Sequence, residues 1–232
     1  MRQLPRTHND RMMIAAVIFD LDGVLIDSES VWDAARREVA REHGGHWTEG
    51  ATTAMIGMSS IEWSAYMHDE LGVELPPEQI SDEVVARLQQ HYRQRLPLLP
   101  GARETVLSFA EHWPLGLASS ANRPIIELVL ELAELRDSFA ATVSSEEVAR
   151  GKPAPDVYLE AARRLGVAPA DCVAVEDSGN GIRSAAAAAM TVVAIPNRDF
   201  PPSEDALALA ADIVDSLTAL SPERVAAGSG HK

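Results

Sequence analysis

Two aspartates, Asp20 and Asp22, stand one residue apart directly after an apolar run. The run, residues 12–18, has the length and composition of a short strand that is buried on both faces. Two carboxylates held together at the tip of such a strand repel each other unless a cation lies between them. Gly23 then lets the chain turn sharply. This spacing indicates a cation-dependent catalytic site; a strand that runs into a solvated acidic loop is the alternative.

Five more polar residues follow other apolar runs of strand length. They are Ser119, Ser120, Lys152, Glu176 and Asp177. Each by itself has a structural explanation, since Asp177 can cap a helix and Lys152 can be a solvated loop charge. Their common position after strands is harder to explain in that way, because open α/β sheets bind ligands at the carboxyl ends of their strands.

This set of side chains suits phosphoryl transfer. Asp20 is predicted to be the nucleophile, which would split the reaction into two displacements through an aspartyl-phosphate. Asp22 would protonate the leaving alcohol and then accept a proton from the attacking water. Lys152, Ser119 and Ser120 would neutralise and orient the oxygens of the phosphoryl group during its transfer.

Four acids are candidates to hold the cation. Mg²⁺ prefers oxygen ligands, commonly one or two protein carboxylates together with phosphate and water. The predicted ligands are Asp20, Asp177, Glu176 and Asp22, the last through its backbone carbonyl. The formal net charge of −15, from 20 basic and 35 acidic residues, would repel an anionic substrate. A bound metal ion and Lys152 would offset that repulsion locally.

Short apolar runs alternate with helical patterns along most of the chain. The runs predict strands at 12–18, 115–119, 140–143, 172–175 and 191–195, with a possible edge strand at 212–214. Between them, helix-like spacing or high alanine content covers 102–111, 125–133, 156–165 and 182–189. This alternation predicts an α/β fold, a Rossmann-like parallel sheet with helices on both faces.

The stretch from about residue 30 to residue 96 interrupts the alternation, because it has helical periodicity and no convincing strand. We expect residues 12–28 and 98–220 to form the catalytic core, 29–97 an all-helical cap domain, and 1–11 and 221–232 flexible tails. Since the insert leaves and rejoins the core close to Asp20, it would suit a lid that excludes water and selects substrate. The alternative is a helical subdomain that only adds core. Trp32, Trp47 and Trp63 are interpreted mainly as packing residues of this bundle, one or two of which could line the substrate side near residues 44–58.

Composition limits the class of protein. The chain has 232 residues, of which 46% are hydrophobic and 24% charged, as in ordinary globular proteins. The negative net charge argues against nucleic acid as a partner, and no apolar run approaches the ~18 residues of a membrane helix. The single cysteine, Cys172, lies in an apolar stretch and is interpreted as a buried, inert thiol in a reducing compartment. These features predict a cytoplasmic protein, with a monomer as the default state.

Four segments, in order, resemble the four motifs of the haloacid dehalogenase superfamily. They are residues 20–25, Ser119, the Gly-Lys-Pro segment 151–153 and the Glu-Asp-Ser segment 176–178. The helical insert resembles the C1-type cap of subfamily I, and the likeness spans about residues 14–215. The resemblance implies a Rossmann-like core, a mobile helical cap, Mg²⁺ and the residue roles given above.

Within the superfamily, the pattern is similar to the branch of β-phosphoglucomutase and small sugar-phosphate phosphatases. Asp22 and the Glu176-Asp177 pair disfavour dehalogenase and phosphonoacetaldehyde hydrolase chemistry. Trp32 replaces a histidine of β-phosphoglucomutase, and no arginine follows Gly57 where the mutase has one. The resemblance therefore favours a Mg²⁺-dependent phosphatase of a sugar or polyol phosphate.

Two other functions stay open at this point. A β-phosphoglucomutase-type phosphosugar mutase would use the same scaffold. A non-catalytic regulatory protein could also keep the fold, but such a protein is expected to lack a nucleophile or a metal ligand, and none is missing here. Asn122 and Arg123, just past Ser119, are secondary site candidates, with solvated helix-start residues as the favoured interpretation.

Overall fold

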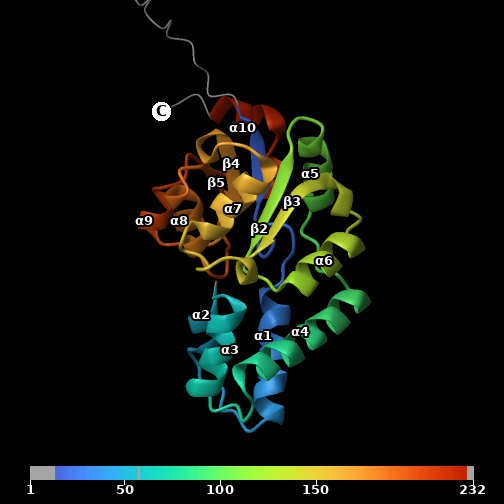
Figure 1. Cartoon of the computed structure of the whole chain (residues 1–232), viewed down its shortest axis with the longest axis vertical. Coiled ribbons are helices and arrows are strands. Elements are labelled where there is room, and N and C mark those ends of the chain that lie inside the picture. Colours follow the sequence, from blue (N-terminus) through green and yellow to red (C-terminus); the bar gives the residue numbers. More distant parts are fainter. Residues whose placement is uncertain (1–13, 57, 229–232) are drawn as a thin grey trace, which may run out of the picture.

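The computed structural model describes residues 14–56 and 58–228. Its centre is a six-stranded parallel sheet in the order β3-β2-β1-β4-β5-β6 (Figure 1). The strands are β1 (Ala16–Phe19), β2 (Leu115–Ser119), β3 (Phe139–Ser144), β4 (Cys172–Glu176), β5 (Thr191–Ala194) and β6 (Asp212–Ile213). The predicted parallel α/β sheet is therefore confirmed. β1 begins at Ala16, four residues later than expected, and residues 12 and 13 lie outside the described part of the chain.

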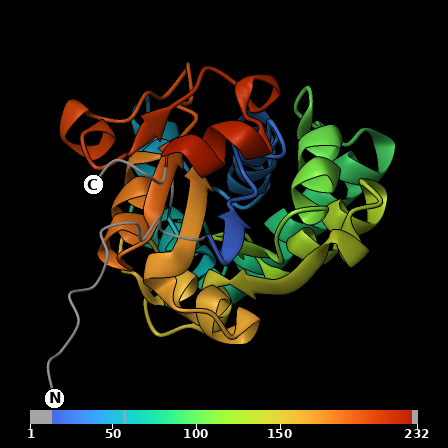
Figure 2. The ribbon, with the colours of Figure 1, turned by 90° about the horizontal axis from the view of Figure 1, so that it is seen from above.

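Helices cover both faces of the sheet (Figure 2). The helices of this layer are α5 (Ala102–Ala110), α6 (Arg123–Leu132), α7 (Asp156–Leu165), α8 (Gly179–Ala187) and α9 (Glu204–Leu207). Because successive strand residues point to opposite faces, Val17 and Phe19 join the core that contains α5 and α6. Ala16 and Ile18 join the second core, which contains α7 and α8. Burial on both faces explains why β1 is apolar without alternation.

The insert between β1 and β2 is helical, as predicted. It contains α1 (Glu29–Glu42), α2 (Ala51–Met55), α3 (Ser60–Asp69) and α4 (Pro77–Gln94), and it lies below the sheet in Figure 1. The two connecting segments pair with each other, since Ile26 bridges to Leu98 and the Asp27 N–H donates to the Pro97 carbonyl at 2.8 Å. We call the residues 29–97 the cap.

The C-terminal segment differs from the expected flexible tail. Residues Pro222–Gly228 form helix α10, and Val225 is 3% exposed in the same core as α5 and α6. Arg224 Nε donates to Asp212 Oδ2 at 2.6 Å, which ties the helix to β6. Short helices are stabilised by tertiary packing more than by their own sequence, so periodicity did not reveal this one. The described residues contain no helix long and apolar enough to cross a membrane.

Candidate active site

The predicted site residues come together at the carboxyl ends of β1, β2 and β4, where a pocket opens between the sheet and the cap. On the sheet side, the lining includes Asp20, Asp22, Ser120, Lys152 and Asp177. This convergence confirms that these side chains, up to 157 positions apart in the sequence, share one edge of the sheet. The parallel topology is the cause, since it brings the carboxyl ends of all strands to the same side.

Asp20 lies directly after β1 and is 5% exposed. Its Oδ1 lies 2.9 Å from Lys152 Nζ, close enough for an ion pair but not aligned for a hydrogen bond, so this buried oxygen has no hydrogen-bond partner. Burial raises the pKa of Asp20 to about 8; the Lys152 charge opposes that rise, and the charges of Glu176 and Asp22 add to it. The site therefore favours a further positive charge beside Asp20.

Lys152 is held by a buried partner of its own. Its Nζ donates to Glu176 Oε1 at 2.6 Å and lies 5.2 Å from the centre of the Tyr158 ring. Burial alone lowers the pKa of Lys152, but the carboxylates of Asp20 and Glu176 raise it above its ordinary value. Lys152 therefore stays protonated while it points at the nucleophile candidate.

Glu176 has no exposed surface, and both of its carboxylate oxygens are hydrogen-bonded. Besides Lys152, the Tyr158 hydroxyl donates to Oε1 at 2.8 Å. The backbone N–H groups of Asp177 and Ser178 donate to Oε2 at 3.1 and 3.3 Å. These contacts orient Lys152 and fix the loop after β4, so Glu176 has a positioning role in addition to its predicted role as a metal ligand.

Three buried acids form a candidate metal site. One carboxylate oxygen from each of Asp20, Glu176 and Asp177 lies within 4.8 Å of the others; we call these residues the carboxylate cluster. Burial, followed by the charges of Glu176 and Asp20, raises the pKa of Asp177 well above its usual value. The all-oxygen donor set, with three buried carboxylates beside the single charge of Lys152, fits a small hard cation such as Mg²⁺.

Gly23 makes room for this cluster. It has φ +76°, which favours glycine, and a Cβ at its position would lie 1.9 Å from Asp177 Oδ2. The glycine noted in the sequence for its turn is therefore also required for close approach of the Asp177 carboxylate.

Asp22 lies outside the carboxylate cluster and is turned toward the cap. Its Oδ1 accepts hydrogen bonds from the Ser28 hydroxyl and from Trp32 Nε1, the latter at 3.0 Å. Its Oδ2 lies 3.4 Å from the Ser119 hydroxyl. The carboxylate is thus held at the boundary of core and cap, where the leaving group of a bound substrate would lie. Metal binding through the Asp22 carbonyl stays a prediction.

The residues after β2 divide into two groups. Ser120 lines the pocket, whereas Ser119 is fully buried and accepts a hydrogen bond from the Ala121 N–H at 3.0 Å. Asn122 is buried rather than solvated and donates to Glu146 Oε1 at 2.8 Å, while Arg123 pairs with Glu147. Neither of these two secondary candidates is among the pocket-lining residues.

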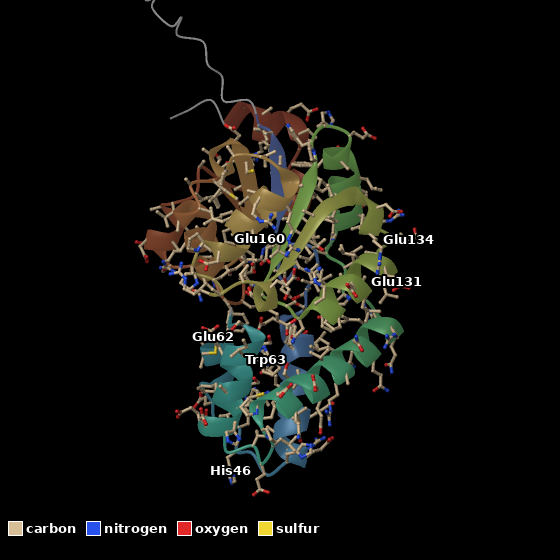
Figure 3. The ribbon with its side chains drawn as sticks, viewed as in Figure 1. His46, Glu62, Trp63, Glu131, Glu134 and Glu160 are labelled. Atoms are coloured by element: carbon tan, nitrogen blue, oxygen red, sulfur yellow. The ribbon has the colours of Figure 1, made fainter. Side chains whose placement is uncertain are left out.

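The cap supplies the other wall of the pocket. Its lining residues are Glu29, Trp32, Arg36, Met55, Ile56, Met58 and Trp63. Figure 3 shows Trp63 in the part of the cap next to the core. Trp32 and Trp63 pack in the cap interior and also line the pocket, so the packing and substrate-side interpretations both hold for them. Gly57, used in the comparison with the mutase, lies outside the described residues.

The polar lining residues that sequence reasoning did not assign to the site include Glu29, Arg36 and Asn197. The first two share a spacing signal with Trp32, because positions 29, 32 and 36 lie on one face of α1. Asn197 follows β5, and its side chain hydrogen-bonds to Asp177 and opposes the rise in the pKa of that acid. The only sequence signal for Asn197 was its position as a polar residue shortly after the fifth predicted strand.

Comparison with known proteins decides the family. The model of the haloacid dehalogenase-like hydrolases matches residues 14–189. The chain belongs to this family. Hexitol phosphatase B of Escherichia coli is 38% identical over 187 residues, which are 79% of this chain and 84% of that protein. The phosphorylated carbohydrates phosphatase of Thermotoga maritima is 32% identical over 75% of this chain and 81% of its own length.

A solved structure of another protein has the same fold. It is a β-phosphoglucomutase from Clostridium difficile, which superposes with a TM-score of 0.81 over 94% of this chain and 97% of its own, at 24% identity. The expected Rossmann-like core with an inserted helical cap is thus confirmed, and this haloacid dehalogenase-like hydrolase is a phosphatase.

Proposed function

We propose that this phosphatase hydrolyses the monophosphate of a small sugar or polyol through an aspartyl-phosphate on Asp20, with Mg²⁺ as cofactor. The observation that carries the proposal is the buried Asp20 carboxylate, whose Oδ1 lies 2.9 Å from Lys152 Nζ and which belongs to the carboxylate cluster. Hexitol phosphatase B and the Thermotoga phosphatase, both named for phosphorylated polyols or carbohydrates, support the substrate class.

In the first step, an Asp20 carboxylate oxygen attacks phosphorus, and the bond from phosphorus to the alcohol oxygen breaks. Lys152, which stays protonated beside Asp20, donates to a phosphoryl oxygen and offsets its charge. Ser120 lines the same wall and can donate its hydroxyl to another. Ser119 does not line the pocket; its hydroxyl oxygen accepts a hydrogen bond from the Ala121 N–H and stabilises the turn after β2.

Asp22 transfers the protons. Protonated Asp22 gives its proton to the leaving alkoxide oxygen in the first step. In the second step, it takes a proton from the water that attacks phosphorus, the bond from Asp20 to phosphorus breaks, and inorganic phosphate leaves. Ser28, just before the cap, and Trp32 of the cap hold Asp22, so the position of the cap affects the position of the proton donor.

When bound, Mg²⁺ supplies positive charge that offsets the phosphoryl oxygens and favours the ionised form of Asp20. Asp20 and Asp177 are the residues that would hold it, with Glu176 close by and the Asp22 carbonyl as a further predicted ligand. Asn197 keeps the Asp177 carboxylate in place.

The test is turnover of p-nitrophenyl phosphate with Mg²⁺ and with EDTA, for the wild type and Asp20→Asn. We expect hydrolysis to depend on Mg²⁺. Asp20→Asn should lower the turnover rate by at least about 1,000-fold, because it removes the covalent nucleophile. Activity that persists in EDTA, or in Asp20→Asn, would contradict the mechanism. A panel of phosphorylated sugars and polyols then ranks substrates by released phosphate.

The mutase alternative has a separate test. A phosphosugar mutase must convert glucose 1-phosphate into glucose 6-phosphate faster than it releases free phosphate, and a coupled assay measures both rates. We expect phosphate release to dominate. Cytoplasmic location and a monomeric state stay predictions, which fractionation and light scattering would check.

A further inference from the structure

The cap contains a buried arginine, Arg36, which forms no ion pair with an acidic side chain in the described part of the chain. Arg36 of α1 lines the pocket, is 6% exposed, and its Nε has no hydrogen-bond partner among the described residues. Its guanidinium lies 4.9 Å from the Trp32 ring centre and 5.1 Å from that of Trp63. Stacking on aromatic rings recovers part of the cost of burying a cation but leaves its N–H donors unsatisfied. Such donors, held at a pocket wall, are available to a ligand.

A second unpaired group lies on the same helix face. Glu29 also lines the pocket, and its buried Oε1 has no hydrogen-bond partner. Seven residues, or two helical turns, separate Glu29 from Arg36, so both lie on the same face of α1, and both line the pocket. No ion pair joins them among the described contacts, although each feels the charge of the other. The cap wall thus offers an acceptor at Glu29 and donors at Arg36, whose guanidinium lies against two indole rings.

The charges around Arg36 argue against a second phosphate as its ligand. Five acids line the pocket, among them Asp22 and Glu29, against only Lys152 and Arg36. Lys152 is already paired with two carboxylates. An anion at Arg36 would therefore also be exposed to the charge of Glu29, which acts on Arg36, and like charges repel. A neutral group with hydroxyls satisfies both residues, because a hydroxyl oxygen accepts from Arg36 while a hydroxyl proton is donated to Glu29.

From these contacts we infer that Glu29 and Arg36 recognise hydroxyl groups of an uncharged polyhydroxylated alcohol, while Trp32 and Trp63 cover its carbon chain. The inference rests on the proposed phosphatase function and goes further, since it assigns selectivity to named cap residues. It also connects recognition to catalysis. Trp32, which stacks under Arg36, donates its N–H to Asp22, the proposed proton donor. A leaving group seated on this wall is therefore next to the acid that protonates it.

The experiment compares kcat/KM of the full chain with Mg²⁺ for three substrates: sorbitol 6-phosphate, p-nitrophenyl phosphate and fructose 1,6-bisphosphate. The variants are Arg36→Met and Glu29→Gln, with Arg41→Met as the matched control, because Arg41 is an exposed arginine on the same helix. Loss of a charged hydrogen bond to a ligand costs about 10- to 100-fold. We expect each cap variant to lose at least about tenfold more on sorbitol 6-phosphate than on p-nitrophenyl phosphate, which has no hydroxyls.

Glu29→Gln gives a test of opposite sign. Removing this negative charge should improve the bisphosphate relative to sorbitol 6-phosphate, whereas Arg41→Met should leave all ratios as in the wild type. Binding of sorbitol 6-phosphate to the Asp20→Asn protein, measured by calorimetry with and without Arg36→Met, gives a readout without turnover, and circular dichroism checks the fold.

The outcomes separate this inference from the proposed function. Equal losses on all three substrates, or a loss confined to the bisphosphate for Arg36→Met, would overturn the recognition of hydroxyls while leaving the phosphatase intact. A wild type that hydrolyses none of the three would overturn the proposed function instead. If Arg36→Met fails to fold, Arg36→Lys replaces it, because lysine keeps the charge but loses the planar set of donors. The kcat/KM ratios between substrates for Arg36→Lys and Glu29→Gln then test the recognition of hydroxyls.

Discussion

Substitution of Gly23 by alanine tests whether the backbone turn after the two aspartates serves the carboxylate cluster. The new Cβ would lie 1.9 Å from Asp177 Oδ2 and 2.4 Å from its Cγ, although real Cβ contacts are essentially never under 3.0 Å. The carboxylate must therefore move by about 1 Å, a displacement that typically costs about 100-fold in rate. That factor corresponds to about 2.7 kcal/mol of transition-state stabilisation. The positive φ adds about 1 kcal/mol to the cost of folding.

Gly166 provides the matched control. It has φ +72°, almost the same as Gly23, but nothing lies within 4 Å of the Cβ that alanine would add. Both variants should lose about 1 kcal/mol in unfolding free energy from the backbone alone. Only Gly23→Ala should lose kcat/KM about 100-fold and need about 10- to 100-fold more Mg²⁺ for half-maximal turnover of p-nitrophenyl phosphate.

The assay is a Mg²⁺ titration of turnover, paired with urea unfolding of each variant. The urea midpoints report the backbone cost, and the difference between the two variants in metal dependence isolates the displacement of Asp177. The reasoning is refuted if Gly23→Ala keeps the Mg²⁺ dependence of the wild type, or if Gly166→Ala changes it as much.

Three further predictions concern the groups around Lys152. Gly181→Ala should destabilise the protein by about 1–3 kcal/mol, because the new Cβ would lie within 2.0 Å of three Glu176 carboxylate atoms. In most helices the same substitution stabilises by up to about 1 kcal/mol. A raised urea midpoint would refute this prediction. Tyr158→Phe removes the 2.8 Å hydrogen bond to Glu176 and should lower the unfolding free energy by about 1.5–3 kcal/mol at unchanged m value, whereas a change below about 0.5 kcal/mol would mean that Lys152 alone satisfies this oxygen. Mg²⁺ should raise the melting temperature more at pH 8 than at pH 5. The pKa of Asp20 is raised from 3.8 to about 8, so between these pH values the folded metal-free protein holds a proton that the unfolded chain releases, and its stability falls as the pH rises. Bound Mg²⁺ replaces that proton and therefore stabilises the folded protein most at the higher pH. An equal shift at both pH values would contradict that assignment.

Most of the sheet and one side of the site were determined by the sequence alone. Apolar runs of four to six residues identify buried parallel strands, because each such strand is covered on both faces. Parallel topology then requires that the residues after β1, β2 and β4 meet, so Asp20, Ser120 and Asp177 could be placed together from their order in the chain. The helical structure of the cap could also be predicted, because its apolar residues have helical periodicity and prolines mark helix boundaries.

What the tertiary structure decided is which atoms meet. The sequence predicted Glu176 as a metal ligand, and only the structure shows that its oxygens also accept hydrogen bonds from Lys152, Tyr158 and backbone N–H groups. Helix α10 forms because Val225 finds a core contributed by distant segments. Local spacing places Glu29 and Arg36 on one face of α1, but only the packing of cap against core puts that face in the same pocket as Asp20 and Lys152. The physical reason is that periodicity records which face of an element is buried, whereas hydrogen bonds and charges act over a few ångströms between elements far apart in the chain.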